Sequence, residues 1–440
     1  MGSQKLVNPG EWMPKEGNVV HNGLPSHLNH FLIPATQIGG LLELITMYST
    51  KLLCRAIPLG MRTAGWVTDK PSAGFTLRSL ILDEVQDNEI LVEMKYSGIC
   101  HTDIAVSKGM LDLTEFPAVL GHEGAGTIMA LGEGVKNKSL KVGDSVVLSY
   151  NTCQTCPACL AGQRAFCHDH PQVNHNAVRL SDRTTPARLL DRTPVRSQYF
   201  GHSSFAKHSV VHEDTVVRCD YPDQLATYAP LGCGFQTGAG AIFNVAKPQQ
   251  HQTAVIFGMG TVGLAALMAC KYIGLKRLIA VDLNNERLKL AAELGATDLL
   301  NAAEIPDVPR AIRALMEQGA DHAVECTGIT GIVEDAVRAT APQGHVTVLG
   351  VPKPGSTFSV DALDFLLANK SIHGIIQGGA QPHSFLPFLM DLHRQGQFPL
   401  EKVCRVFSAR YINQAIKSMH SGETIKPVLS WGDVSIDEGM

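Results

Sequence analysis

The chain has 440 residues, 45% of them hydrophobic, and a formal net charge of −4 at pH 7. This length exceeds what a single hydrophobic core supports, so we expect more than one domain. The weakly acidic charge argues against nucleic acid as the main partner, because a phosphate backbone requires a strongly basic surface. No apolar run reaches the roughly 20 residues that a membrane span needs.

The 11 cysteines indicate metal ligands and free thiols rather than disulfides. Four of them cluster at Cys153, Cys156, Cys159 and Cys167, and no secretory signal is recognisable. We therefore expect a reducing, cytoplasmic compartment, in which disulfides are rare.

Residues 1–60 differ from the rest of the chain. The first thirty are polar and rich in Gly, Pro, Asn and His, which predicts a poorly ordered extension. Residues 38–59 are more apolar but interrupted by charges, and we interpret them as a short amphipathic helix on a surface; a membrane anchor is the alternative.

Residues 61–233 are predicted to be mostly β. Short runs rich in β-branched residues lie between Gly, Asp and Asn turns, at Thr76–Leu82, Glu89–Tyr96, Ala125–Leu131 and Asp144–Leu148. The stretch 174–198 carries five arginines, at 179, 183, 188, 192 and 196. We expect a solvated surface loop there, and an anion-binding loop is the alternative.

Residues 234–377 change to strand–helix alternation. Strands are predicted at Thr253–Phe257 and Arg277–Val281, with helices at Thr261–Ile273 and Asn285–Leu294, and strands follow at 322–324 and 345–349. This pattern predicts a doubly wound parallel sheet with helices on both faces. Residues 378–440 contain two predicted helices and a closing strand near Pro427–Trp431, and we expect them to return to the first domain.

The segment from Gly98 to Gly126 has the composition of a catalytic metal site. Cys100 offers a thiolate and His122 an imidazole, both of which bind zinc. Cys233, directly before the strand–helix region, is the best candidate for a third ligand. Three protein ligands leave the fourth position of a catalytic zinc open. A buried cysteine or a core histidine is the alternative for each residue taken alone.

The four clustered cysteines have the spacing C-x2-C-x2-C-x7-C. Four thiolates without histidine predict a closed, structural zinc site. An iron–sulfur cluster is the alternative, because four cysteines also hold such clusters.

The stretch Gly258-Met259-Gly260-Thr261-Val262-Gly263 follows a predicted strand and opens a predicted helix, as a dinucleotide-binding turn requires. Gly258 makes the turn, Gly260 lets the pyrophosphate approach the backbone, and Gly263 lets helix and strand pack closely. Asp282 ends the next strand. A carboxylate there accepts hydrogen bonds from the ribose and repels a 2′-phosphate, which favours NAD over NADP. We also predict that Thr261, Val262 and Arg287 contact the cofactor.

With these motifs in this order, residues 61–440 resemble the zinc-containing medium-chain alcohol dehydrogenase family, whose zinc ligands are two cysteines and a histidine. Ser149-Tyr150 and the stretch 374–378 make the chain similar to its aryl (benzyl) alcohol dehydrogenase branch. The resemblance implies a GroES-like catalytic domain at 61–233, a Rossmann domain at 234–377 and a return to the catalytic domain at 378–440.

The resemblance also assigns roles to site residues. Cys100, His122 and Cys233 would bind the catalytic zinc, with Glu123 as a second carboxylate near it. Thr102 would hold the substrate hydroxyl and pass on its proton, Asp103 would orient His122, and Lys426 would contact the cofactor pyrophosphate. Many family members carry a relay histidine where this chain has Ala105, so the proton must leave Thr102 by another route, through the ribose and His101 or through water.

The resemblance implies hydride transfer between NAD(H) and a primary aromatic or allylic alcohol or its aldehyde, with two zinc ions per chain and a homo-oligomer, dimer or tetramer. Zinc would favour the alkoxide of the bound alcohol. Tyr150 and Phe235 are candidate neighbours of a substrate ring. A role in a fungal type of biosynthetic pathway is compatible with the resemblance.

Other functions remain as alternatives. A polyol or secondary-alcohol dehydrogenase of the same family usually has Glu in place of Cys233. A zinc-free quinone or enoyl reductase would lack Cys100 and His122. A non-catalytic NAD-binding zinc protein would not need Thr102 beside an open metal site.

Overall fold

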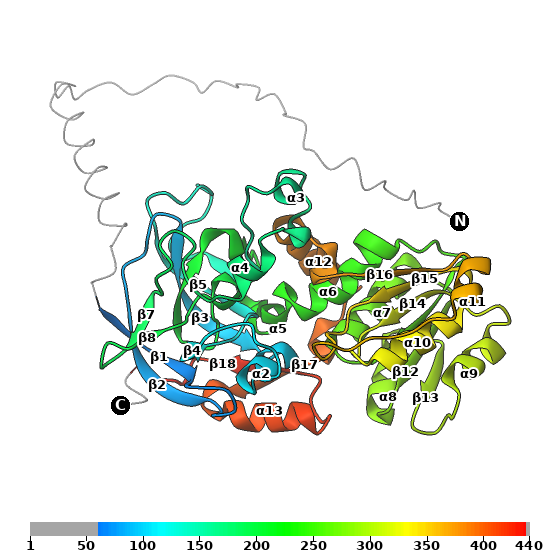
Figure 1. Ribbon diagram of the computed structural model, residues 1–440. Helices are drawn as coiled ribbons and strands as arrows, with labels where there is room; N and C mark the ends of the chain where they lie inside the picture. Colours follow the sequence, from blue (N-terminus) through cyan, green and yellow to red (C-terminus); the bar gives the residue numbers. More distant parts are fainter. Residues whose placement is uncertain (1–59, 437–440) are drawn as a thin grey trace, which may run out of the picture. The chain divides into compact units, whose positions relative to one another are not determined.

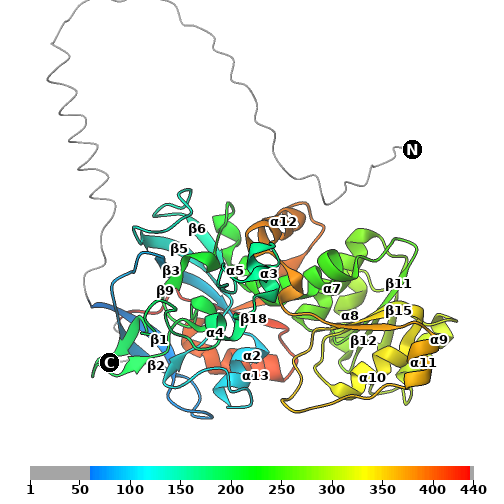
Figure 2. The same cartoon turned by 45° about the horizontal axis from the view of Figure 1, so that its top comes forward.

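The computed structural model describes residues 60–436 (Figures 1 and 2). The extension and the amphipathic helix expected before Gly60 lie outside the described residues. Within residues 60–436, no helix is both long enough and apolar enough to cross a bilayer.

The first half of the described chain forms two sheets of short strands. One sheet has the order β4-β1-β2-β7-β8 and the other contains β10-β6-β5-β3-β18-β17, with β9 also paired to β3. The strands of this half span β1 Met61–Thr68, β2 Thr76–Leu82, β3 Glu89–Gly98, β4 Ala118–Val119, β5 Gly124–Leu131, β6 Ser145–Leu148, β7 Ala187–Leu189, β8 Pro194–Val195, β9 His208–His212 and β10 Val216–Arg218. The four strands predicted from the sequence correspond to β2, β3, β5 and β6.

The second half contains a six-stranded sheet in the order β13-β12-β11-β14-β15-β16. Every neighbouring pair is parallel, and the order 3-2-1-4-5-6 is that of a Rossmann fold. Its strands span β11 Thr253–Phe257, β12 Arg277–Asp282, β13 Asp298–Asn301, β14 Ala320–Glu325, β15 Thr340–Val348 and β16 Ser371–Gly374.

Helices cover both faces of this sheet (Figure 1). Side chains alternate between the faces, so Ala254 and Ile256 of β11 join one buried cluster with α7 and α8, whereas Val255 and Phe257 join another with α9 and α10. The helices span α7 Thr261–Ile273, α8 Asn285–Leu294, α9 Val308–Leu315, α10 Thr330–Ala339 and α11 Ala362–Leu367. The predicted doubly wound sheet is confirmed.

The last segment joins the sheets of the first half. After α12 (Pro382–Arg394), β17 (Cys404–Ser408) and α13 (Ile412–His420), β18 (Lys426–Ser430) pairs antiparallel with the end of β3. The Trp431 indole donates to Ser97 Oγ at 2.9 Å, and both side chains are buried. This pairing brings Lys426 close to the end of β3, which lies two residues before Cys100.

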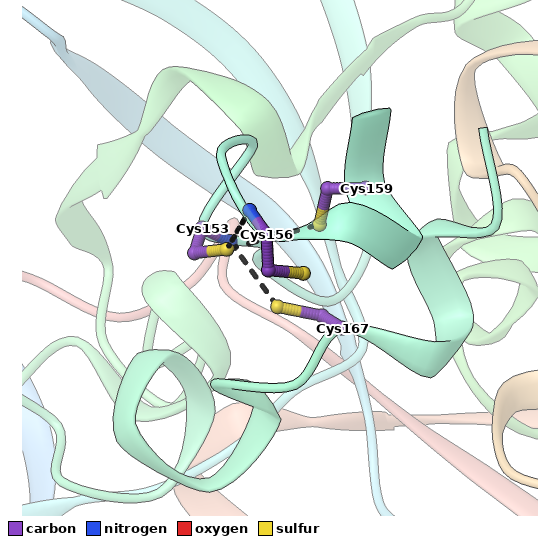
Figure 3. A group of neighbouring side chains, drawn as sticks. All are labelled: Cys153, Cys156, Cys159 and Cys167. Atoms are coloured by element: carbon purple, nitrogen blue, oxygen red, sulfur yellow. Dashed lines mark hydrogen bonds between the residues drawn. The ribbon is translucent and has the colours of Figure 1, made fainter. Parts of the chain in front are cut away.

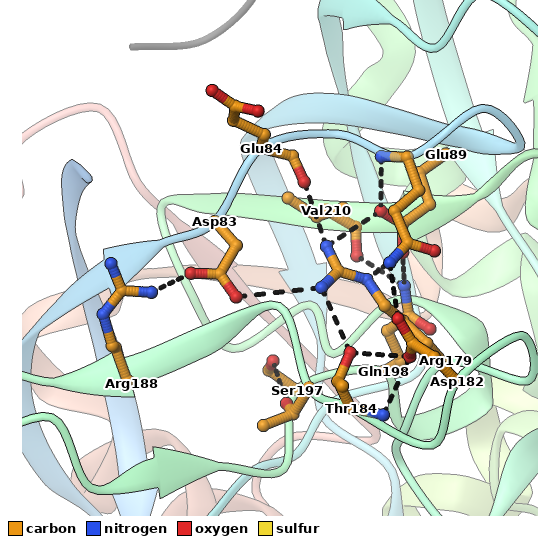
Figure 4. A network of polar contacts seen from close by, with 12 residues as sticks. Asp83, Glu84, Glu89, Arg179, Asp182, Thr184, Arg188, Ser197, Gln198 and Val210 are labelled. Atoms are coloured by element: carbon orange, nitrogen blue, oxygen red, sulfur yellow. Dashed lines mark hydrogen bonds and ion pairs between the residues drawn. The ribbon is translucent and has the colours of Figure 1, made fainter. Parts of the chain in front are cut away.

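The arginine-rich stretch is not a solvated loop throughout, and the expectation is wrong for Arg179. Its guanidinium, 5% exposed, donates to both carboxylate oxygens of Glu89 at 2.9 and 3.0 Å and to Glu84 O at 3.0 Å. Gln198 Nε2 also donates to Glu89 at 2.6 Å (Figure 4). A buried carboxylate needs such partners. Glu89 of β3 therefore anchors the stretch 174–198 to the sheet through Arg179 and Gln198.

Candidate active site

Three segments far apart in sequence meet at the first site. Cys100 precedes α2 (His101–Ser107), His122 lies two residues before β5, and Cys233 precedes α6 (Gly234–Gly240). The possible ligand atoms of Cys100, His122, Glu123 and Cys233 all lie within 4.8 Å of one another, and His122 Nε2 is 3.2 Å from Cys233 Sγ. Two thiols and an imidazole at this spacing fit a zinc ion.

The His122 ring is oriented by Asp103, which is fully buried. Asp103 Oδ1 accepts from His122 Nδ1 at 2.7 Å and from Gly121 N at 3.1 Å, while Oδ2 accepts from Cys100 N at 3.1 Å. With Nδ1 occupied, Nε2 faces the cysteines, as a metal-binding histidine requires. A hydrogen bond from the Cys233 thiol holds the pKa of Cys100 well below its usual range against the effect of burial, which favours the thiolate that binds metal.

Glu123 is paired with Lys426 beside the same cluster. Lys426 Nζ lies 2.9 Å from each carboxylate oxygen of Glu123 and 3.0 Å from Ile99 O, and Lys426 is only 3% exposed. The three ammonium hydrogens therefore have acceptors within the chain. In this structure Lys426 contacts Glu123 and Ile99. Its predicted contact with a cofactor pyrophosphate stays a prediction.

Thr102 and His101 occupy the first turn of α2. Thr102 Oγ1 is 3.7 Å from Cys100 Sγ, so its hydroxyl borders the cysteine and histidine cluster. His101 is exposed, and its ring centroid lies 6.4 Å from that of His420 in α13.

The four clustered cysteines meet in a second group (Figure 3). Their sulfur atoms all lie within 4.8 Å of one another, and Cys153 Sγ is 3.9 Å from Cys159 Sγ. A tetrahedral zinc with bonds of about 2.3 Å separates its sulfurs by about 3.8 Å. Backbone amides of Cys153, Cys156 and His168 donate to sulfurs of the group, which stabilises thiolates.

The predicted dinucleotide turn has the geometry that its glycines suggest. Gly258 has φ +92°, and a Cβ on Gly263 would lie 1.8 Å from Gly258 O. A Cβ on Gly260, by contrast, would meet nothing within 4 Å. That open space at the start of α7 fits a pyrophosphate on a helix N-terminus, and Thr261 and Val262 form the first turn there.

Asp282 and Arg287 lie beside this turn. Asp282 ends β12, and its Oδ2 accepts from Met259 N at 2.6 Å. Arg287 is in the first turn of α8, near Gly422 of the loop before β18, where an added Cβ would lie 3.9 Å from the guanidinium. The other oxygen of Asp282, Oδ1, accepts from Asn284 N at 2.9 Å. The predicted contact of this carboxylate with a cofactor ribose stays a prediction.

Comparisons with known proteins show the family of this chain. Residues 86–221 match the alcohol dehydrogenase GroES-like domain and residues 261–393 match the zinc-binding dehydrogenase domain. The chain is 37% identical over 344 residues to geraniol dehydrogenase of Castellaniella defragrans, covering 78% of this chain and 90% of that protein. The chain belongs to the zinc-containing medium-chain alcohol dehydrogenase family.

Two further relatives support this membership. The chain is 32% identical over 381 residues to alcohol dehydrogenase class-3 of Cereibacter sphaeroides, covering 84% of this chain and 100% of the relative. The crystal structure of benzyl alcohol dehydrogenase from Acinetobacter calcoaceticus is 36% identical, with a TM-score of 0.80 over 84% of this chain and 99% of that one. As in this family, the chain is an oxidoreductase that acts on alcohols.

Sequence reasoning did not find the aromatic residues beside His122, one of the predicted zinc ligands. Phe200 stacks on His122 with ring centroids 4.6 Å apart, and Tyr199 meets the same imidazole edge-on at 5.8 Å. His170 and His175 lie 6.2 and 5.7 Å from Phe200. Only the fold brings these rings to His122, because nothing in their spacing marks them.

The two aromatic residues that were predicted as substrate neighbours lie in different surroundings. The Tyr150 ring is 6.3 Å from that of His170, and its hydroxyl donates to Ala380 O at 2.5 Å. Phe235 is fully buried in the cluster that contains α7 and β11 side chains. Tyr150 therefore lies next to the aromatic group that surrounds His122, through His170, and Phe235 packs in a core.

Proposed function

We propose that this protein interconverts primary aromatic or allylic alcohols and their aldehydes with NAD(H), using Cys100, His122 and Cys233 as ligands of a catalytic zinc. The observation that carries the proposal is the convergence of these three ligands with the Thr102 hydroxyl beside them. A second, structural zinc is proposed at the four clustered cysteines.

When bound, zinc supplies Lewis acidity toward the substrate oxygen, and the nicotinamide supplies the two-electron redox chemistry. The chain positions and desolvates the reactants. Asp103 fixes the tautomer of His122, and the Thr102 hydroxyl, 3.7 Å from Cys100 Sγ, would accept the substrate proton. Because position 105 is Ala, we propose that this proton then leaves through the cofactor ribose and His101 or through water.

The choice of substrate rests on the aromatic group beside His122. Tyr199 and Phe200 are 0% and 5% exposed, so this side of the site is apolar and excludes water, which suits a conjugated or aromatic substrate. Geraniol is an allylic alcohol and benzyl alcohol an aromatic one, and enzymes named for both substrates are among the relatives.

The choice of NAD rests on Asp282 at the end of β12. Its carboxylate would accept hydrogen bonds from ribose hydroxyls and repel a 2′-phosphate.

The described cysteines form no disulfide with one another, which is consistent with the cytoplasmic location that we propose.

We also propose a homo-oligomer, dimer or tetramer. β16 is at the edge of the parallel sheet, and α11 exposes Leu363, Leu366 and Leu367 at 64%, 73% and 76%. An unpaired strand edge and an adjacent apolar surface favour association with a second copy.

Turnover of a panel of alcohols with NAD tests the proposed reaction. We expect benzyl-type and allylic alcohols to give the highest kcat/KM, followed by saturated primary alcohols. Faster oxidation of polyols or secondary alcohols would contradict the substrate assignment, and no turnover of any alcohol by zinc-loaded protein would contradict the function.

A further inference from the structure

Gln236 connects the peptide before Cys233 to the segment that leaves the parallel sheet. It lies in α6 and is fully buried. Its amide nitrogen faces three acceptors, which are Ser149 Oγ at 2.8 Å, Gly232 O, and Gln377 Oε1 at 3.1 Å. These acceptors come from three separate parts of the chain.

The contact between Gln236 and Gly232 O fixes the backbone that carries Cys233. The Gly232 carbonyl accepts from Gln236 and also from Ser149 Oγ at 2.8 Å. A Cβ on Gly232 would lie 1.8 Å from Leu148 O, so this peptide is also packed tightly against the residues beside Ser149. Cys233 itself has non-helical φ and ψ of −138° and −86°. Its orientation therefore depends on how the preceding peptide is held.

The contact between Gln236 and Gln377 reaches residues 375–381, which connect β16 to α12. Gln377 begins a turn, Gln377–Gly379, that packs closely on α6, since a Cβ on Gly240 would lie 2.5 Å from Gly378 O. Asn244 Nδ2 donates to Gly378 O at 3.1 Å, and Tyr150 OH donates to Ala380 O. The connection between the Rossmann sheet and α12 is thus hydrogen-bonded to Tyr150, to Asn244 and, through Gln236, to α6.

We propose that Gln236 is a positioning residue that couples the connection 375–381 to the Cys233 backbone, so that cofactor binding on the Rossmann sheet alters the geometry of the catalytic metal site. The inference rests on the proposed ligand role of Cys233. It also gives a physical role to Ser149 and Gln377, two of the residues on which the resemblance to the aryl branch rests.

The coupling is tested by visible spectroscopy of the full-length protein loaded with Co²⁺, which replaces zinc in tetrahedral sites. The difference spectrum on adding NAD removes the constant contribution of the four-cysteine site. In Gln236→Met, the donor is lost at nearly constant side-chain length. We expect altered cobalt bands without NAD, a weaker NAD-induced change, and a kcat lowered about threefold to tenfold, as for one lost hydrogen bond.

Two further variants separate coupling from general damage. Gln377→Met breaks only the outer contact, so the cobalt bands without NAD should match wild type while the NAD-induced change is weaker. Asn244→Ala removes a hydrogen bond to the same connection without touching Gly232, and both spectra should stay unchanged. If Gln236→Met does not fold, the comparison of Gln377→Met with Asn244→Ala decides the matter.

The proposal is overturned if Gln236→Met and Gln377→Met both give wild-type spectra, if Asn244→Ala gives the same change as Gln377→Met, or if cobalt in an active wild-type enzyme does not respond to NAD. Absence of both alcohol oxidation and thiolate-to-cobalt bands in the NAD difference spectrum of wild type would instead overturn the proposed function.

Discussion

Lys426 Nζ lies 2.9 Å from both carboxylate oxygens of Glu123, and the two side chains are 4% and 0% exposed. The pair sits beside Cys100 and Cys233. Burial raises the pKa of Glu123, and so does the negative charge of a Cys100 thiolate, whereas the Lys426 ammonium opposes both effects. A buried ion pair is strongly destabilised when only one partner is removed.

Lys426→Met should therefore destabilise the protein by about 3–5 kcal/mol, measured as a lower thermal midpoint at constant zinc content. Replacing both partners, as Glu123→Gln with Lys426→Met, should recover most of that loss, because no buried charge then lacks a partner. A large increase in the Kd for NAD with an unchanged midpoint would show instead that Lys426 serves the cofactor.

The two zinc sites should respond differently to loss of one ligand. Cys153→Ser removes a ligand from a closed site, and since such sites contribute to folding we expect a lower thermal midpoint and one zinc ion fewer per chain. Cys100→Ser should abolish turnover while the midpoint stays near that of wild type. Metal analysis of wild type giving fewer than two zinc ions per chain would contradict both assignments.

The motifs that lie close together in sequence could be predicted because their chemistry is local. Gly258, Gly260 and Gly263 stand at fixed spacing around one turn, and Thr102 follows Cys100 by two positions. Glu123 and Lys426 are 303 positions apart, so no spacing rule connects them, and only the pairing of β18 with β3 does. The same holds for Arg179 and Glu89, whose contact depends on how the loop folds back onto β3.

Other features could not be predicted because they bury few side chains or have an unusual backbone conformation. α11 buries none of its side chains, so its leucines give no periodic apolar face from which a helix is recognised. β13 has one buried residue among four. Phe200 adopts a left-handed backbone conformation, with φ 53° and ψ 30°, and a sequence gives no reason to expect that geometry for Phe.

Asp282 should determine the choice of cofactor. Asp282→Ser removes the negative charge that a 2′-phosphate would meet, so kcat/KM for NADP should rise and that for NAD should fall. Both values are compared with the kcat/KM of the wild-type enzyme for NAD and NADP, which should favour NAD. A wild-type enzyme that prefers NADP would show that the Asp282 carboxylate does not face the ribose.

Arg179 should stabilise the fold through its contact with Glu89. Arg179→Met leaves Glu89, which is 2% exposed, without a cation, and we expect a loss of about 3–5 kcal/mol. Arg188→Met provides the control, because Arg188 pairs with Asp83 where both are about 30% exposed and half-exposed pairs contribute about 0–1 kcal/mol. Equal thermal midpoints for the two variants would contradict this role.

Thr102 carries the last prediction. Its hydroxyl borders Cys100 in the first turn of α2, and in the proposed reaction it takes the substrate proton. Thr102→Ala should lower kcat by roughly 10²–10⁴-fold, the range for a positioned acid–base group, whereas Thr102→Ser keeps the hydroxyl and should retain most activity. Both variants should bind zinc and NAD as wild type does, because neither function uses this side chain. An unchanged kcat in Thr102→Ala would mean that the proton leaves the substrate by a route that does not include Thr102.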